Sequence, residues 1–115
     1  MSFFYALQLY SVRDELEKDF YGTVKQVREM GYDGVELSGL NGADPLEVKR
    51  ILDEVGLKVI SSHVPVEEML TPGSLARYKQ AGCQYVAIPW MDHGAHNEKF
   101  AENIEQIRLL ANMAM

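Results

Sequence analysis

The chain has 115 residues, 47% of them hydrophobic and 24% charged, and its 11 Lys and Arg against 17 Asp and Glu give a net charge of −6. This length predicts one domain, residues 1–115, and the acidic balance argues against a nucleic-acid partner. A single cysteine, Cys83, excludes an internal disulfide and is typical of a reducing compartment. The N-terminal segment lacks the pattern of a signal peptide, and no apolar run approaches the roughly 20 residues of a membrane span. We therefore expect a cytoplasmic protein without a membrane partner.

Four apolar segments predict β-strands, at residues 3–10, 33–37, 57–64 and 84–90. Each is followed by apolar positions at helical spacing, and a glycine ends each of the first three helices: Gly31, Gly56 and Gly82. Asp44-Pro45 and Thr71-Pro72 predict the starts of the second and third helices. Residues 11–18 form a polar stretch before the first helix, and residues 92–97 form a polar loop before the fourth. The chain therefore consists of four strand–helix units.

Repeated strand–helix units predict an α/β fold with parallel strands, in one of two architectures. A doubly wound open sheet has helices on both faces, whereas a (β/α)₈ barrel has them on one side only. Alternation along the strands places Gln8, Glu36, His63 and Trp90 on one face, and on the fourth strand it groups Trp90 with Val86 and Ile88. The opposite face, with Leu7, Val35 and Ile60, is apolar. Polar residues at successive strand ends are typical of the mouth of a barrel, so we expect half of a (β/α)₈ barrel.

Four segments of the sequence together resemble the xylose-isomerase-like TIM-barrel superfamily: LQLYSVRDEL, GYDGVEL, SSHV and YVAIPW. This superfamily includes sugar and sugar-phosphate isomerases and epimerases, inosose dehydratases and AP endonucleases. The resemblance covers nearly the whole chain and implies that it corresponds to the N-terminal half of such a barrel. In the isomerase branch the ligands of the divalent metal (Mn, Mg, Zn or Co) lie on strands five to eight. We therefore expect no metal or other cofactor in this chain, and its own enzymatic activity stays open.

Four residues are the candidates for a site. The resemblance implies that Glu36 acts as a catalytic acid or base on a sugar, and that His63 contacts the sugar or, as in the AP endonuclease branch, a metal. Trp90 offers an apolar wall for a sugar ring, and Gln8 offers a hydrogen bond. Three of these residues also have a structural alternative: an exposed carboxylate for Glu36, a ring bonded to the Ser61 or Ser62 hydroxyl for His63, and core packing for Trp90.

Three further features carry weaker signals. Asp92, His93 and His96 have the composition of a metal cluster but lack a recognisable spacing, which favours a solvated loop. Arg13 follows the first strand and is placed either to bind phosphate or to form a surface ion pair. Cys83 has no basic neighbour in the sequence, which favours a structural thiol over a nucleophile.

A half-barrel leaves two strand edges and one sheet face uncovered. We therefore expect a homo-oligomer, formed through the sheet edges and the inner face, with a small sugar as the ligand of the parent enzyme. Two alternatives remain open at this point: a purely structural assembly, and a flavodoxin-like open-sheet binding module without catalysis. The second lacks a glycine-rich phosphate loop after the first strand, where SVRDELEKD stands instead.

Overall fold

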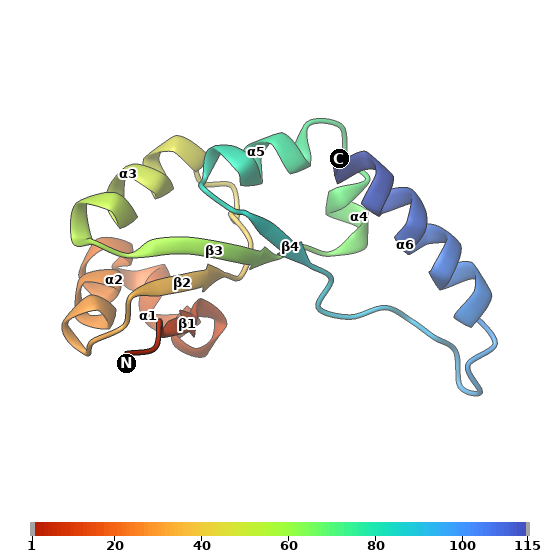
Figure 1. The fold of residues 1–115 in the computed structure, drawn as a ribbon, viewed down its shortest axis with the longest axis horizontal. Helices are drawn as coiled ribbons and strands as arrows, with labels where there is room; N and C mark the ends of the chain where they lie inside the picture. Colours follow the sequence, from red (N-terminus) through yellow and green to blue (C-terminus); the bar gives the residue numbers. More distant parts are fainter. Residues whose placement is uncertain (1, 115) are drawn as a thin grey trace.

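The computed structural model describes residues 2–114; Met1 and Met115, the two ends of the expected domain, lie outside the described residues. In chain order the elements are β1 (Ala6–Gln8), the 3₁₀ turn η1 (Leu9–Val12), α1 (Arg13–Lys18), α2 (Phe20–Glu29), β2 (Gly34–Leu37), α3 (Pro45–Val55), β3 (Lys58–His63), α4 (Val66–Met69), α5 (Ser74–Gln80), β4 (Tyr85–Ala87) and α6 (Phe100–Ala114) (Figure 1).

The four strands form one parallel sheet in the order β1-β2-β3-β4 (Figure 1). The order follows the sequence without a reversal, whereas a doubly wound sheet reverses its strand order at the switch point. Parallel strands in sequential order, joined by helices, are the repeating unit of a (β/α)₈ barrel. The α/β fold with a half-barrel arrangement is confirmed, and the flavodoxin-like alternative does not match this strand order.

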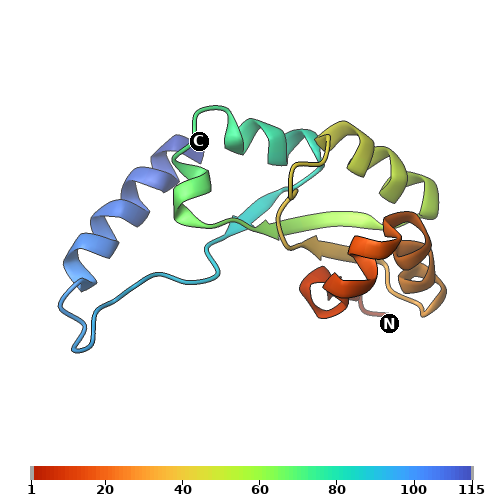
Figure 2. The same ribbon diagram turned by 180° about the vertical axis from the view of Figure 1, so that it is seen from behind.

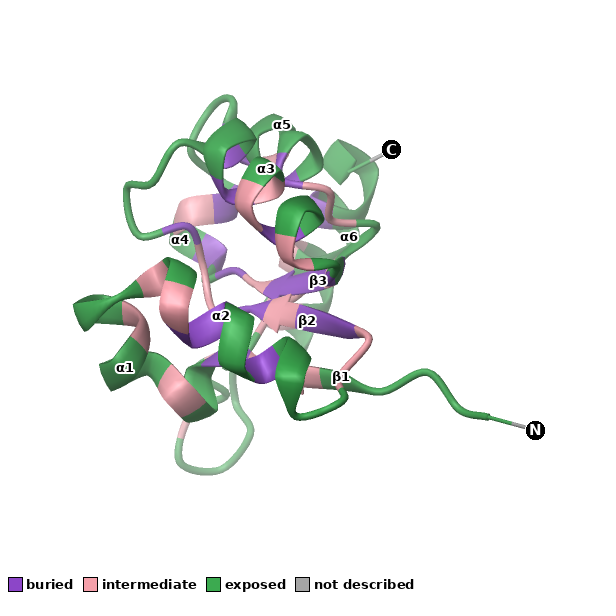
Figure 3. Ribbon diagram, turned by 90° about the vertical axis from the view of Figure 1, so that its left-hand side faces the viewer, coloured by how far each residue is buried: buried purple, intermediate pink, exposed green. Residues whose placement is uncertain are grey.

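The helices α1, α2, α3 and α5 lie in an arc around one side of the sheet, and the other side faces outward without helical cover (Figure 3). The view from behind shows an extended segment leading away from β4 to the start of α6, which then runs back so that its C-terminal end lies near α4 (Figure 2). The described residues contain no helix that is both long and apolar enough to cross a membrane.

The hydrophobic core lies between the sheet and this arc of helices. Val35 and Leu37 of β2 are buried against it, as are Val24 of α2 and Leu52 of α3. The alternate residue of β2, Glu36, points to the open side, because successive side chains of a strand face opposite ways. The alternation predicted for this strand therefore places Val35 and Leu37 in the core and Glu36 on the open face.

Local sequence signals explain the ends of α3. The Asp44 carboxylate accepts a hydrogen bond from the Leu46 N–H at 3.0 Å, and Pro45 occupies the first turn, where its missing N–H costs nothing. Gly56 ends the helix with a left-handed backbone at φ 88°, a conformation that favours glycine. The predicted start and end of this helix are confirmed.

Other boundaries differ from the sequence-based expectation. Residues 11–18, expected to be a polar stretch outside the helices, are helical, in η1 and α1. Val12 and Leu16, four positions apart, lie on the same side of this helical segment and pack against the core. The expected helix after Thr71-Pro72 begins only at Ser74, and the short helix α4 precedes it. The first and fourth strands are shorter than predicted, with three residues each.

Candidate functional site

Gln8, Glu36 and His63 lie together at the carboxyl ends of three adjacent strands. Gln8 is the last residue of β1 and lies opposite Glu36 of β2, while His63 is the last residue of β3. Glu36 lies opposite Ser61 of β3, two residues before His63, so all three site residues face the open side of the sheet. Parallel strands bring their carboxyl ends to one edge, which is where barrel enzymes carry their active sites.

The three side chains form a continuous chain of polar contacts. The Gln8 side-chain nitrogen lies 2.9 Å from Nδ1 of His63, and Nε2 of His63 lies 3.3 Å from Oε1 of Glu36. The other carboxylate oxygen of Glu36 accepts a hydrogen bond from the Ser61 hydroxyl. Residues 55 positions apart in the sequence, Gln8 and His63, are thereby joined in one network.

One backbone contact fixes the orientation of the Gln8 side-chain amide, and with it the direction of the hydrogen bond from Gln8 to His63. The Tyr10 N–H donates to Oε1 of Gln8, so the amide group presents its NH₂ to His63. Nδ1 of His63, the nearer ring nitrogen at 2.9 Å, is then the acceptor, while Nε2 lies 3.4 Å from the same amide nitrogen and 3.3 Å from the Glu36 carboxylate. This arrangement favours the tautomer whose ring proton is on Nε2, the nitrogen that faces the carboxylate.

Solvent reaches the network from the open side. The side chains of Glu36 and His63 are 25% and 37% exposed, respectively. A carboxylate and an imidazole that are in contact with each other and open to solvent can bind hydroxyl groups and can exchange protons with a bound ligand.

A second serine fixes the backbone beneath the site. The Ser62 hydroxyl, on the buried face of β3, accepts from the Gly39 N–H at 3.1 Å and donates to the His63 carbonyl at 3.0 Å. This contact ties the loop after β2 to the end of β3, so the strands carrying Glu36 and His63 are held in one relative position. Neither serine hydroxyl bonds to the His63 ring; Ser61 instead binds Glu36.

Trp90 does not join this network. It lies three residues beyond the end of β4, and it is 71% exposed. The register pairs Tyr85 with Ser61 and Ala87 with His63, so these residues of β4 face the open side. Val86 and Ile88 pack against the core instead. The expected faces of the fourth strand are therefore wrong, because the register aligns Ala87, not Trp90, with the end of β3.

The sequence analysis also missed Tyr85 as a member of the open face. Tyr85 is paired with Ser61, whose side chain faces the open side, so the Tyr85 side chain faces that side too. It is 67% exposed. A shift in register between Val35 and Glu36 inserts an extra residue in β3, and Val59, rather than Ile60, packs in the core. Such a bulge leaves no mark in the sequence pattern.

The remaining candidates have local partners. The Asp92 carboxylate binds Lys99 at 2.7 Å and the Gly94 N–H at 2.9 Å, and the hydrogen bond from Lys99 lowers the pKa of Asp92 below its usual range. The Arg13 guanidinium lies 4.0 Å from the centre of the Tyr10 ring and donates to the Tyr10 carbonyl, rather than to an acidic side chain.

Cys83 is half-buried and packs against the hydrophobic core, just before β4. Burial raises the pKa of its thiol to about 11, and the negative charge of Glu36 adds to this effect. The thiolate is the nucleophilic form of cysteine, and it is scarce at neutral pH when the pKa is this high.

The donor set does not fit a zinc ion. Glu36 and His63 supply two ligands, and within residues 2–114 no group of three His, Cys, Asp or Glu side chains is placed to hold an ion. Zinc sites in proteins use three or four protein ligands, so these two side chains do not make a zinc site by themselves.

The chain matches no protein-family model, and a comparison with curated proteins finds no relative. Functional assignment therefore rests on the network itself and on the sequence resemblance.

Proposed function

We propose that this chain is a half-barrel form of a sugar or sugar-phosphate isomerase or epimerase, and that the Gln8–Glu36–His63 network binds the hydroxyl and carbonyl groups of a small sugar. The observation that carries the proposal is the contact between Glu36 and His63 at 3.3 Å, at the carboxyl ends of adjacent parallel strands. A sugar offers many hydroxyl groups, each of which can donate to a carboxylate and accept from an amide or imidazole N–H.

The chemistry expected of the parent enzyme is proton transfer on carbon. Glu36 would remove the proton from the carbon next to the sugar carbonyl. The electron pair of that C–H bond would form the C=C bond of an enediolate, and the carbonyl pair would move onto its oxygen. Return of the proton from Glu36 to the former carbonyl carbon, with transfer of the neighbouring hydroxyl proton to the former carbonyl oxygen, would complete an isomerisation. Epimerisation would instead need a proton from a second acid on the opposite face of the enediolate.

We assign no step to a metal, because the described residues supply too few ligands for one. The family's metal ligands belong to strands that the four described units do not include. The isolated chain is therefore expected to bind sugars weakly and to turn over little or nothing. The cytoplasmic location that we also propose is supported by the single cysteine.

The test is a binding titration. A panel of aldoses, ketoses and their phosphates is added to ¹⁵N-labelled protein, and the amide signals of residues around Gln8, Glu36 and His63 are followed. The expected result is saturable shifts at these strand ends. Glu36→Gln should weaken binding about tenfold or more, which corresponds to about 1.4 kcal/mol.

The matched control is Glu29→Gln, which removes the same charge from an exposed position on α2. It should leave the binding curve unchanged. Absence of saturable shifts with every sugar at millimolar concentration, in a chain shown to be folded, would overturn the proposal.

A further inference from the structure

Both edges of the sheet lack a neighbour within the described residues. β1 pairs only with β2, and β4 pairs only with β3. An edge strand presents a row of unpaired backbone N–H and C=O groups, which can accept another strand. Each edge of this sheet is therefore a potential site of strand addition.

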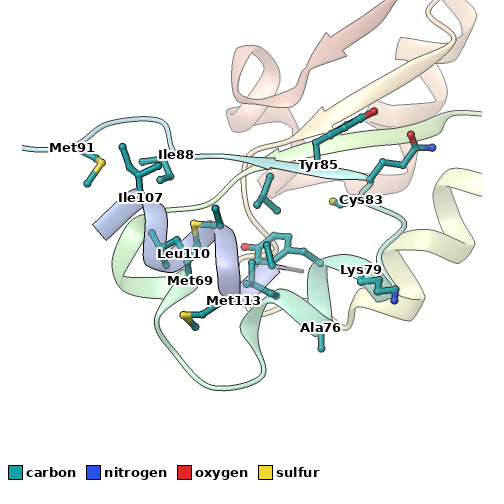
Figure 4. Close-up of a pocket in the computed structure, with 16 residues that line it drawn as sticks. Met69, Ala76, Lys79, Cys83, Tyr85, Ile88, Met91, Ile107, Leu110 and Met113 are labelled. Carbon is teal, nitrogen blue, oxygen red and sulfur yellow. The ribbon is translucent and has the colours of Figure 1, made fainter. Parts of the chain in front are cut away.

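An apolar groove of about 950 Å³ lies next to the β4 edge, between β4, α5 and α6. Figure 4 shows Ile107 and Leu110 of α6 on one side of it and Ile88 and Met69 near them. The groove lies beside β4, the last strand of the sheet, and the described residues place no further strand there. It is therefore open on the side where another strand would pair with β4.

The opposite edge carries uncovered aromatic side chains. Phe3, Phe4 and Tyr5, which directly precede β1, are 69%, 55% and 58% exposed. Phe3 and Tyr5 contact each other edge to face at 6.4 Å between ring centres, and alternation places them on the same side as Leu7, towards the helical layer. Phe4 lies on the open face, against the Cα of Gly34. One edge thus offers aromatic groups and the other offers an apolar groove.

We propose that two copies of this chain associate by placing β1 of one copy beside β4 of the other in parallel, with Phe3 and Tyr5 entering the groove beneath α6. A two-fold axis parallel to the strands keeps the strands of both copies pointing in the same direction. The dimer then contains two identical β1–β4 junctions. The eight strands then close, as eight parallel strands do in a (β/α)₈ barrel, and no free edge remains. This proposal rests on the half-barrel of the proposed function.

The exposed area matches what a stable dimer needs. Phe3, Phe4, Tyr5, Tyr85 and Trp90 are each more than half exposed. Since a buried aromatic side chain covers about 150–250 Å², these five present on the order of 600 Å². Ile107 and Met113 of the groove, 42% and 46% exposed, bring the total towards the roughly 800 Å² per partner of a standard interface.

Closure would also change the surroundings of the site. The open face that carries Gln8, Glu36 and His63 becomes the barrel interior, where the same residues of the second copy face it. The sugar site is then enclosed by residues from both copies, which a single chain cannot provide.

The first test is native mass by sedimentation over a hundredfold range of protein concentration. The chain, of 13.0 kDa, is expected to double its mass as concentration rises. Tyr5→Glu and Ile107→Glu should each raise the dissociation constant at least tenfold, since each places a charge in the junction. Leu46→Glu is the control, because Leu46 is 59% exposed on α3, a helix that contributes no side chain to the groove. Circular dichroism checks that each variant is folded.

A cross-linking experiment distinguishes this junction from other dimers. In a Cys83→Ala background, one chain carries Tyr5→Cys and another carries Ile107→Cys, and a short bis-maleimide is added. The mixture should give a cross-linked dimer, whereas each chain alone should not. A chain that stays monomeric at every concentration, or that cross-links equally well alone, would overturn the proposal.

The two proposals fail separately. A monomer that still binds sugar through Glu36 contradicts the dimer and leaves the proposed function standing. A dimer whose strand-end signals do not respond to any sugar contradicts the proposed function alone.

Discussion

The Tyr78 hydroxyl of α5 accepts a hydrogen bond from the backbone N–H of Leu40, which lies 38 residues earlier in the loop between β2 and α3, at 3.3 Å. The same hydroxyl donates to Glu68 at 2.6 Å. Burial raises the pKa of Tyr78 well above its usual value, and the bond to the Glu68 carboxylate adds to that rise. A buried phenol thus connects the loop after β2 to α4, on the far side of the sheet from the open face.

Tyr78→Phe is expected to destabilise the fold by about 1–3 kcal/mol, because it leaves the buried N–H of Leu40 without an acceptor and removes the donor to Glu68. Urea unfolding followed by circular dichroism measures the change. Tyr21→Phe, at a tyrosine that is 42% exposed on α2, serves as control and should shift stability by less than about 0.5 kcal/mol. Equal effects of the two variants would show that the Tyr78 contacts contribute nothing.

The thiol of Cys83 should titrate far above a free cysteine, with a pKa of about 11. Because the chain has one cysteine, the ¹³Cβ chemical shift of Cys83, followed by NMR against pH, reports this group directly. Glu36→Gln should lower the midpoint, since the Glu36 charge disfavours the thiolate. Glu29→Gln should leave it in place, and a wild-type midpoint near 9 would contradict the prediction.

The same shift predicts how stability falls at alkaline pH. The pKa of Cys83 in the folded chain, about 11, lies above the ordinary value of 9.0. Between these two pH values the thiol is therefore ionised in the unfolded chain but still protonated in the folded one. Its stabilising contribution is complete below pH 9 and is lost as the pH rises through about 11. Cys83→Ala should therefore show a shallower loss of unfolding free energy over this window, measured by urea titrations at successive pH values. Parallel pH profiles for the two proteins would argue against it.

Asp44→Ala should cost about 0.5–2 kcal/mol, because the first turn of α3 loses the acceptor for its Leu46 N–H. Asp44→Asn keeps a side-chain oxygen at the same place and should retain most of the stability. Faster hydrogen exchange at Leu46 in the alanine variant, but not in the asparagine variant, would localise the effect. Equal stability of all three proteins would contradict the capping role.

The tautomer of His63 can be observed by long-range ¹H–¹⁵N spectroscopy of the imidazole. The wild type should carry its proton on Nε2, with Nδ1 accepting from Gln8. Gln8→Glu replaces that donor by an acceptor, so Nδ1 should gain a proton. A wild-type ring protonated on Nδ1 would contradict the hydrogen-bond directions inferred for the network.

Elements with strong local signals were predictable. The Asp44-Pro45 start and the Gly56 end of α3 depend on capping and on a left-handed backbone, both of which are properties of a few adjacent residues. The polar strand ends at Gln8, Glu36 and His63 followed from alternation, but their mutual contacts did not. The faces of β4 were mispredicted, because the backbone pairing of Ala87 with His63 sets them and the residue types do not.

Periodicity, capping and turn residues were enough to predict the α/β class, the four strand–helix units and the polar residues at three strand ends, because these signals act over a few neighbours in the chain. The strand order, the register with its shift after Val35, the hydrogen bonds from Tyr10 through Gln8 to His63, and the contact of His63 with Glu36 became visible only in the folded chain. These depend on which strands pair and at what offset, and that choice is made by the packing of the whole core.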